Sequence, residues 1–129
     1  MKNGKKPQGQ LSRLLEGTNE SMYWVGFLMA DGYINFKVMR MALVLADKDK
    51  GHLLKFAQFI NCGTCRKSRD GIHGVFVQDK RVVPEIARKY DWKPRKTENP
   101  PDLSYLDGDL LISFLVGMID GDGHIRRQK

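Results

Sequence analysis

The sequence predicts a single α+β domain in the broad α/β class, with the element order αββαββα followed by one further helix. Apolar residues recur at helical spacing in four segments, and two pairs of strand-like segments lie between them. An Asp-Gly turn signal divides the second pair. The chain has 129 residues, of which 41% are hydrophobic, so it can bury the core of one domain of ordinary size.

The first half of the chain predicts a helix followed by a hairpin. The helix is expected over residues 22–30, with Asn19 or Ser21 as its N-cap. Leucines within residues 11–15 predict a short helical turn before it. Residues 33–45 alternate in polarity and then continue as strand-like sequence, which predicts two antiparallel strands that turn near residues 37–40.

The rest of the chain repeats this alternation. Apolar residues at helical spacing within residues 53–60 predict a second helix, with Asp47 or Asp49 as its N-cap. Residues 64–77 form a second predicted hairpin around Asp70-Gly71, a dipeptide that favours tight hairpin turns. A third helix is expected over residues 82–92 and a fourth over residues 109–121.

The charge of the chain indicates the class of its partner. Lys and Arg total 22 while Asp and Glu total 15, which gives a formal net charge of +7 and an isoelectric point near 9.5. An excess of this sign favours a polyanion, most commonly nucleic acid.

The N-terminus and the apolar stretches bear on location. The first residues are polar and lack the apolar segment of a signal peptide. The longest apolar stretch, residues 110–119, is interrupted by Ser113 and Gly117 and is about half the length of a membrane span. We therefore expect an intracellular protein that is not secreted and that has no membrane partner.

One heptapeptide pattern occurs twice in the same register, at residues 26–32 and 117–123. Each copy has two small residues four positions apart, which lie on one helix face and allow a second helix to approach closely. These predicted interface residues are Gly26, Ala30, Gly117 and Gly121. Each copy then ends in Asp-Gly, and the glycine is expected to stop the helix in the left-handed conformation. Asp31 and Asp122 would thus lie at the same end of a helix pair.

A carboxylate at a helix C-terminus is disfavoured by about 0.3–1 kcal/mol because the unpaired carbonyls there carry partial negative charge. A single Asp-Gly after an apolar run is most often a helix stop or a turn. Two copies in register favour a functional reason for keeping Asp31 and Asp122.

These residues resemble a known signature. Residues 115–123 are similar to the nine-residue motif of the LAGLIDADG homing endonucleases, and residues 24–32 form a looser copy. The first copy departs from the motif at Trp24 and at Met29, where the second copy has Asp120. The resemblance implies a LAGLIDADG homing-endonuclease half-fold, αββαββα, whose four-stranded antiparallel sheet forms a saddle over DNA, plus a second LAGLIDADG helix.

The resemblance also implies a chemistry. A site-specific double-strand endonuclease of this family hydrolyses phosphodiester bonds, and the eighth motif residue supplies the carboxylate that binds metal and acts in catalysis. Here those residues are Asp31 and Asp122, and the expected metal is Mg²⁺ or Mn²⁺. A lysine after the last helix of the unit is expected to assist catalysis, and Lys93 and Lys96 are the positional candidates. A solvated linker lysine that contacts phosphate is the alternative for both.

The same resemblance divides the chain into three parts. Residues 1–20 are expected to be a basic N-terminal arm, residues 21–100 the first half-domain, and residues 101–129 a linker with the second motif helix. Because the strands of a second half are missing after Gly123, the second half is truncated. We therefore expect double-stranded DNA as the substrate, and a second chain or a homodimer to complete the saddle.

DNA recognition is expected on the exposed face of the sheet, where polar side chains read base edges. Strand alternation assigns this face to Tyr33, Asn35, Lys37, Arg40, Thr64, Arg66, Ser68 and His73. A shift of one residue would move each set to the other face and would bring in Lys67 and Arg69.

Other functions stay open on the sequence. The chain could be a non-catalytic nucleic-acid-binding protein, either an intron maturase that binds intron RNA or a DNA-binding regulator, or an inactive fragment of a longer two-motif endonuclease. Cys62 and Cys65 form a CxxC pair, but a structural zinc site would need His73 and a further histidine, so two reduced cysteines are the simpler interpretation.

Overall fold

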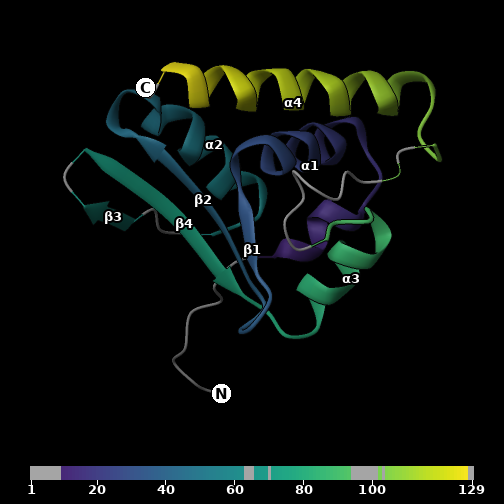
Figure 1. Ribbon diagram of the computed structural model, residues 1–129, viewed down its shortest axis with the longest axis horizontal. Coiled ribbons are helices and arrows are strands. Elements are labelled where there is room, and N and C mark those ends of the chain that lie inside the picture. The colour runs from purple at the N-terminus through teal and green to yellow at the C-terminus, as the bar shows by residue number, and fades with distance from the viewer. Residues whose placement is uncertain (1–9, 63–65, 70, 94–101, 103, 128–129) are drawn as a thin grey trace.

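The computed structural model describes residues 10–62, 66–69, 71–93, 102 and 104–127, with side chains outside residues 66–69 and 124–127. It is an α+β fold with four α-helices in the described part, as predicted (Figure 1). The elements follow the predicted order: η1 (Leu11–Leu15), α1 (Asn19–Asp31), β1 (Tyr33–Asn35), β2 (Arg40–Ala46), η2 (Asp47–Asp49), α2 (Lys50–Phe59), β3 (Arg66–Arg69), β4 (Ile72–Gln78), α3 (Val82–Lys89) and α4 (Gly108–Arg127).

The strands pair antiparallel in the order β1-β2-β4-β3. The regular part of this sheet has three strands, β1, β2 and β4, and β2 and β4 pair along their whole length. β3 is short, and its pairing with β4 shifts register between Lys67 and Arg69. The prediction of a regular four-stranded saddle is therefore not confirmed, because a four-residue edge strand with a register shift does not extend the sheet evenly.

Strand alternation fixes which face of the sheet is buried. Met41, Leu43 and Leu45 of β2 are buried, and Met41 and Leu43 pair with the buried Val77 and Val75 of β4. Helices α1 and α2 cover this face (Figure 1). The strand residues that alternate with these buried residues occupy the opposite face, which we call the open face of the sheet.

Helix α1 begins and ends for identifiable reasons. Thr18 is the N-cap, not Asn19 or Ser21 as predicted, and it exchanges hydrogen bonds with Ser21 in a capping box. The helix ends at Asp31, but Gly32 has φ −93° and is not left-handed as expected. Gly32 is needed for space, since a Cβ there would lie 2.8 Å from the Leu28 side chain and 3.0 Å from the Ala42 carbonyl oxygen.

Helix α4 is longer than predicted. It continues past Gly121 and Gly123 to Arg127, because Gly123 does not adopt a left-handed backbone. A glycine in the middle of an apolar helical run lowers helix stability without stopping the helix. None of the described helices has the length and apolar character needed to cross a membrane.

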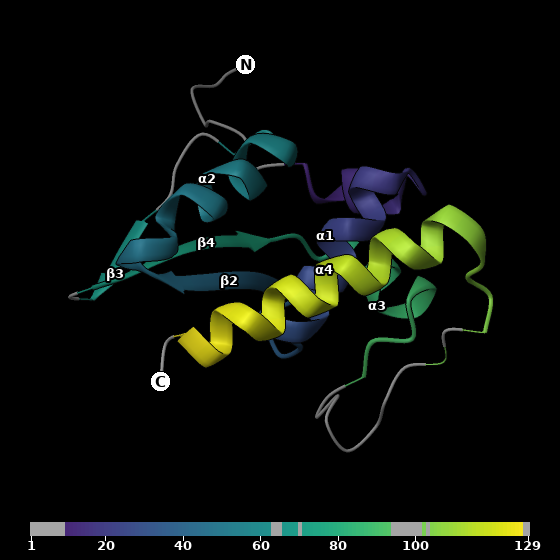
Figure 2. The same cartoon turned by 90° about the horizontal axis from the view of Figure 1, so that it is seen from above.

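Helices α1 and α4 lie side by side along their length (Figures 1 and 2). A Cβ built on Gly26 would lie 2.0 Å from the Phe114 carbonyl oxygen, and one on Gly117 would lie 1.9 Å from the Tyr23 carbonyl oxygen. A Cβ on Gly121 would lie 2.8 Å from that of Ala30. All four predicted interface residues therefore form the contact, which we call the glycine seam, and it is close because it packs backbone against backbone.

The N-terminal arm is shorter than predicted. η1 buries Leu11 and Leu14 in the core, so residues 11–15 belong to the folded unit and only residues 1–9 lie outside the described part. The Tyr90 hydroxyl donates a hydrogen bond to the Leu14 carbonyl oxygen and ties η1 to the end of α3. Burial, and secondarily Tyr105, raises the pKa of Tyr90 to about 12.

The glycine seam predicts a contrast between two glycines of α4. Gly117→Ala should lower the free energy of unfolding by roughly 3 kcal/mol, because its methyl group would collide with a backbone carbonyl that cannot move alone. Gly123→Ala, with no atom within 4 Å of the new Cβ, should raise it by about 0.5–1 kcal/mol. Urea unfolding of both variants measures this, and similar effects of the two substitutions would contradict a close seam.

Candidate active site

The glycine seam brings the two motif aspartates together. Ala30 and Gly121 touch across it, and each is followed directly by an aspartate, Asp31 or Asp122. Equivalent residues of the two copies meet, so the helices run parallel and both carboxylates lie at the same end of the pair. Asp31 is half-buried and Asp122 is exposed.

The two carboxylates are not equivalent with respect to their helices. Asp31 is the last residue of α1, where the helix dipole disfavours a negative charge. Asp122 lies more than one turn before the end of α4, so the prediction that it terminates its helix is wrong. The seam thus holds both aspartates at the same end of the helix pair, but the electric field of the helix dipole differs between Asp31 and Asp122.

A shallow pocket of about 400 Å³ adjoins Asp122. Its lining is otherwise apolar and consists of Ala30, Leu115, Met118 and Ile119. The pocket lies beside the seam on the side of α4. The carboxylate of Asp122 is therefore accessible from an apolar hollow.

The donor set is limited to two carboxylates. The described part of the chain contains no cluster of three or more His, Cys, Asp or Glu side chains that could hold a metal ion. Mg²⁺ accepts such a set, because it prefers oxygen ligands and commonly keeps several waters or binds substrate phosphates alongside one or two carboxylates. Two carboxylates at the same end of a helix pair would also be stabilised in their ionised forms by a cation between them. The chemistry of this donor set is compatible with Mg²⁺.

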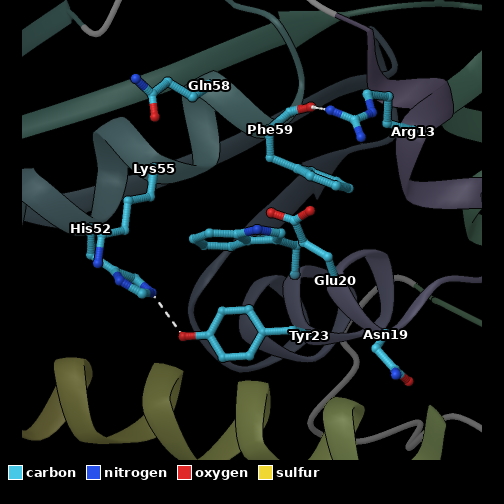
Figure 3. A pocket seen from close by; sticks show the side chains of 9 residues that line it. Arg13, Asn19, Glu20, Tyr23, His52, Lys55, Gln58 and Phe59 are labelled. Atoms are coloured by element: carbon cyan, nitrogen blue, oxygen red, sulfur yellow. Dashed lines mark hydrogen bonds between the residues drawn. The ribbon is translucent and has the colours of Figure 1, made fainter.

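A polar chain links three helices beside the seam, and sequence reasoning missed it. The Tyr23 hydroxyl donates a hydrogen bond to Asp120 Oδ2 on α4 at 2.6 Å and lies 2.9 Å from His52 Nε2 on α2. Figure 3 shows Tyr23 extending from α1 toward His52. Since the hydroxyl hydrogen goes to Asp120, His52 donates through Nε2. Burial, and then the hydrogen bond and charge of Asp120, raise the pKa of Tyr23 well above its usual value. The difference between Asp120 and Met29 in the two motif copies was the available sequence signal.

A larger pocket of about 630 Å³ lies between η1, α1 and α2 (Figure 3). Trp24 and Phe59 contribute aromatic surface to it, and Arg13 and Lys55 contribute positive charge. Arg13 is committed to the fold, since it lies 4.4 Å over the Phe59 ring and donates to the Phe59 carbonyl oxygen at 2.6 Å. No sequence motif predicts a function for these residues.

The predicted DNA-binding residues of β1 and β2 lie where expected. Tyr33 pairs with Ala42 and Asn35 pairs with Arg40, which places Tyr33, Asn35 and Arg40 on the open face. Lys37 lies in the turn, where its backbone N–H donates to Asn35 Oδ1 at 3.0 Å. Part of the Asn35 side chain is therefore used to shape the turn.

The predicted residues of the second hairpin divide differently. His73 pairs with Leu45, is buried on the core face, and its Nε2 bonds to Asp47 Oδ1, so its assignment to the DNA surface is wrong. The reason is that Val75 and Val77 must be buried and His73 shares their face. Arg66 pairs with Gly74, and Ser68 lies in β3. Thr64 lies outside the described residues.

The candidate catalytic lysines are not both described. Lys93 is exposed and forms an ion pair with Asp91 Oδ2 at 3.3 Å, just after α3. Both views place α3 toward the beginning of α4, whereas Asp122 lies toward its end (Figures 1 and 2). Lys96 lies outside the described residues. Cys62 forms no disulfide with a described residue, and Cys65 also lies outside the described part.

No protein-family model matches this chain, and no match was found among curated proteins. The LAGLIDADG resemblance therefore stays a prediction carried by the two motif copies.

Proposed function

We propose that this chain is a LAGLIDADG-type, site-specific double-strand DNA endonuclease unit that hydrolyses phosphodiester bonds with a divalent metal, Mg²⁺ or Mn²⁺. The observation that carries the proposal is the contact between Ala30 and Gly121, because the next residues of the two helices are Asp31 and Asp122. The packing of α1 against α4 would require only the small residues of the seam. Two aspartates at the next position are not required by packing, since Asp122 is exposed.

Asp31 and Asp122 would hold the metal. When bound, the metal polarises the scissile phosphate and lowers the pKa of a coordinated water. The contribution of this chain is to hold two carboxylate oxygens on rigid helix backbones. Ile119 and Leu115 give the pocket beside Asp122 an apolar lining.

The open face of the sheet is the proposed DNA surface. Tyr33, Asn35, Arg40 and Gln78 supply groups that donate or accept hydrogen bonds, and the net charge of +7 favours the phosphate backbone. Arg40 Nε is shielded from solvent and has no hydrogen-bond partner among the described residues. Because Nε itself is shielded, contact with a base edge or a phosphate oxygen would fall to the other guanidinium nitrogens of this partly exposed residue, which makes Arg40 a candidate recognition residue.

A second structural unit is proposed to cover the far side of α4. The motif copies are offset by 91 positions (115 − 24 = 91), so Val25 corresponds to Val116 and Leu28 to Ile119. Leu28 is 0% exposed in the core, whereas Ile119 is 70% exposed. Ile112, Leu115 and Val116 are exposed on the same helix. A second chain, or a second copy of this chain, would bury this face as the first sheet buries α1.

The proposed self-association through α4 can be tested by placing a charge on its exposed apolar face. Ile119→Lys should abolish self-association in sedimentation velocity, because an ammonium group cannot be buried in an apolar contact without a partner. Leu54→Lys, at the exposed Leu54 of α2, is the matched control and should leave association unchanged. A monomer at all concentrations in the wild type would contradict the homodimer and leave only a different chain as the partner.

The proposed chemistry is tested with a supercoiled plasmid that carries the genomic sequences flanking the coding region, joined without interruption. The wild type should cut it in Mg²⁺ or Mn²⁺ and not in EDTA. Asp31→Asn and Asp122→Asn should each reduce the rate at least about 100-fold, because each removes a charged metal ligand. Asp109→Asn, at an exposed position in the first turn of α4, is the matched control and should cut like the wild type.

Binding must be measured in the same experiment by band shift at several salt concentrations. DNA that is bound but never nicked would contradict the endonuclease and support the alternative of a non-catalytic nucleic-acid-binding protein. Intron RNA would then be the next ligand to test. The alternative of an inactive fragment would be tested by adding the missing half of the longer enzyme.

A further inference from the structure

The two helices make almost identical backbone contacts in the glycine seam. Gly26 approaches the Phe114 carbonyl and Gly117 approaches the Tyr23 carbonyl, and residues 23 and 114 are equivalent positions of the two copies. The backbone contact is thus reciprocal. Two copies of α1 from different chains, or two copies of α4, could form the same close contact, so the seam alone does not choose which helices pair.

One pair of side chains beside the seam breaks this equivalence. Tyr23 of α1 donates to Asp120 Oδ2 of α4 at 2.6 Å. At the positions equivalent by the 91-residue offset (114 − 23 = 91), the chain has Phe114 and Met29, both buried and apolar. The reciprocal positions therefore carry one polar pair and one apolar pair.

We propose that the Tyr23–Asp120 hydrogen bond, braced by His52, is a pairing lock that selects α1·α4 over pairing between like helices of two copies. In an α1·α1 pair, each Tyr23 hydroxyl would face Met29, whose thioether is a weak acceptor. In an α4·α4 pair, each Asp120 carboxylate would face Phe114. Each like pair contains two such mismatches, whereas the α1·α4 pair contains none.

The position of His52 supports this role. His52 Nε2 lies 2.9 Å from the Tyr23 oxygen and so gives the hydroxyl a second hydrogen-bond partner beside Asp120. His52 belongs to α2, which packs on the same sheet as α1. The lock therefore connects α4 to the folded unit beyond the seam. This inference goes beyond the proposed endonuclease and holds whether or not the chain cuts DNA.

The lock restricts how a second unit can join. Because α1·α4 is the favoured pair, a partner would not enter by exchanging motif helices. It would instead cover the exposed face of α4 that contains Ile112, Val116 and Ile119.

A disulfide trap tests the lock with the full chain. Asp31→Cys, combined with Cys62→Ser and Cys65→Ser, places the only thiol just past the seam contact, where two α1 helices would meet in a like pair. Under mild oxidation this background should give little disulfide-linked dimer. Adding Tyr23→Phe and Asp120→Met makes the side chains beside the seam apolar at all four positions, and the linked fraction should rise at least fivefold.

The matched control makes the same chemical changes elsewhere. Tyr33→Phe with Asp109→Met, both at exposed positions, should leave the linked fraction at the background value. Tyr23→Phe alone should give an intermediate rise, and it serves as the test if circular dichroism shows that the double variant does not fold. An unchanged linked fraction in folded protein, or an equal rise in the control, would overturn the lock. Loss of DNA cleavage would not affect this readout.

Discussion

The close approach of α1 and α4 is the constraint on which the rest of this structure depends. Three glycines and Ala30 replace interlocking side chains with backbone contact, so the two helices have little freedom to separate. Their parallel direction then sets Asp31 next to Asp122. The same approach gives Tyr23 an acceptor on α4. The candidate metal site and the polar chain are both consequences of the seam.

The two helices share a seam but differ in surroundings. α1 is buried between α4 and the sheet, and Trp24, Val25 and Leu28 form part of the core. α4 has core on one side and exposed apolar residues on the other. A helix with this much exposed apolar surface indicates an interaction site. The chain therefore combines one layer whose core is complete with a helix whose far side carries exposed apolar residues.

The sequence predicted the features that depend on residue spacing. It missed those that depend on which face of a strand a residue occupies and on the room around a glycine. Helical spacing located the four helices, and the repeated small residues identified the seam. His73 was misassigned because both faces of β4 carry apolar residues, so alternation alone did not fix its parity. Gly123 was expected to stop α4, but the helix has room to continue there. The Tyr23–Asp120 contact joins residues far apart in the chain, and no local pattern predicts it.

The central claim is that the seam unites two carboxylates into one metal site. It is tested most directly by the paramagnetic broadening of backbone amide NMR signals when less than one equivalent of Mn²⁺ per chain is added. A shared site predicts that the Gly32 and Gly123 amides broaden together, and that Asp31→Asn or Asp122→Asn removes the effect at both. Broadening confined to one of the two glycines, or unchanged by either substitution, would contradict it.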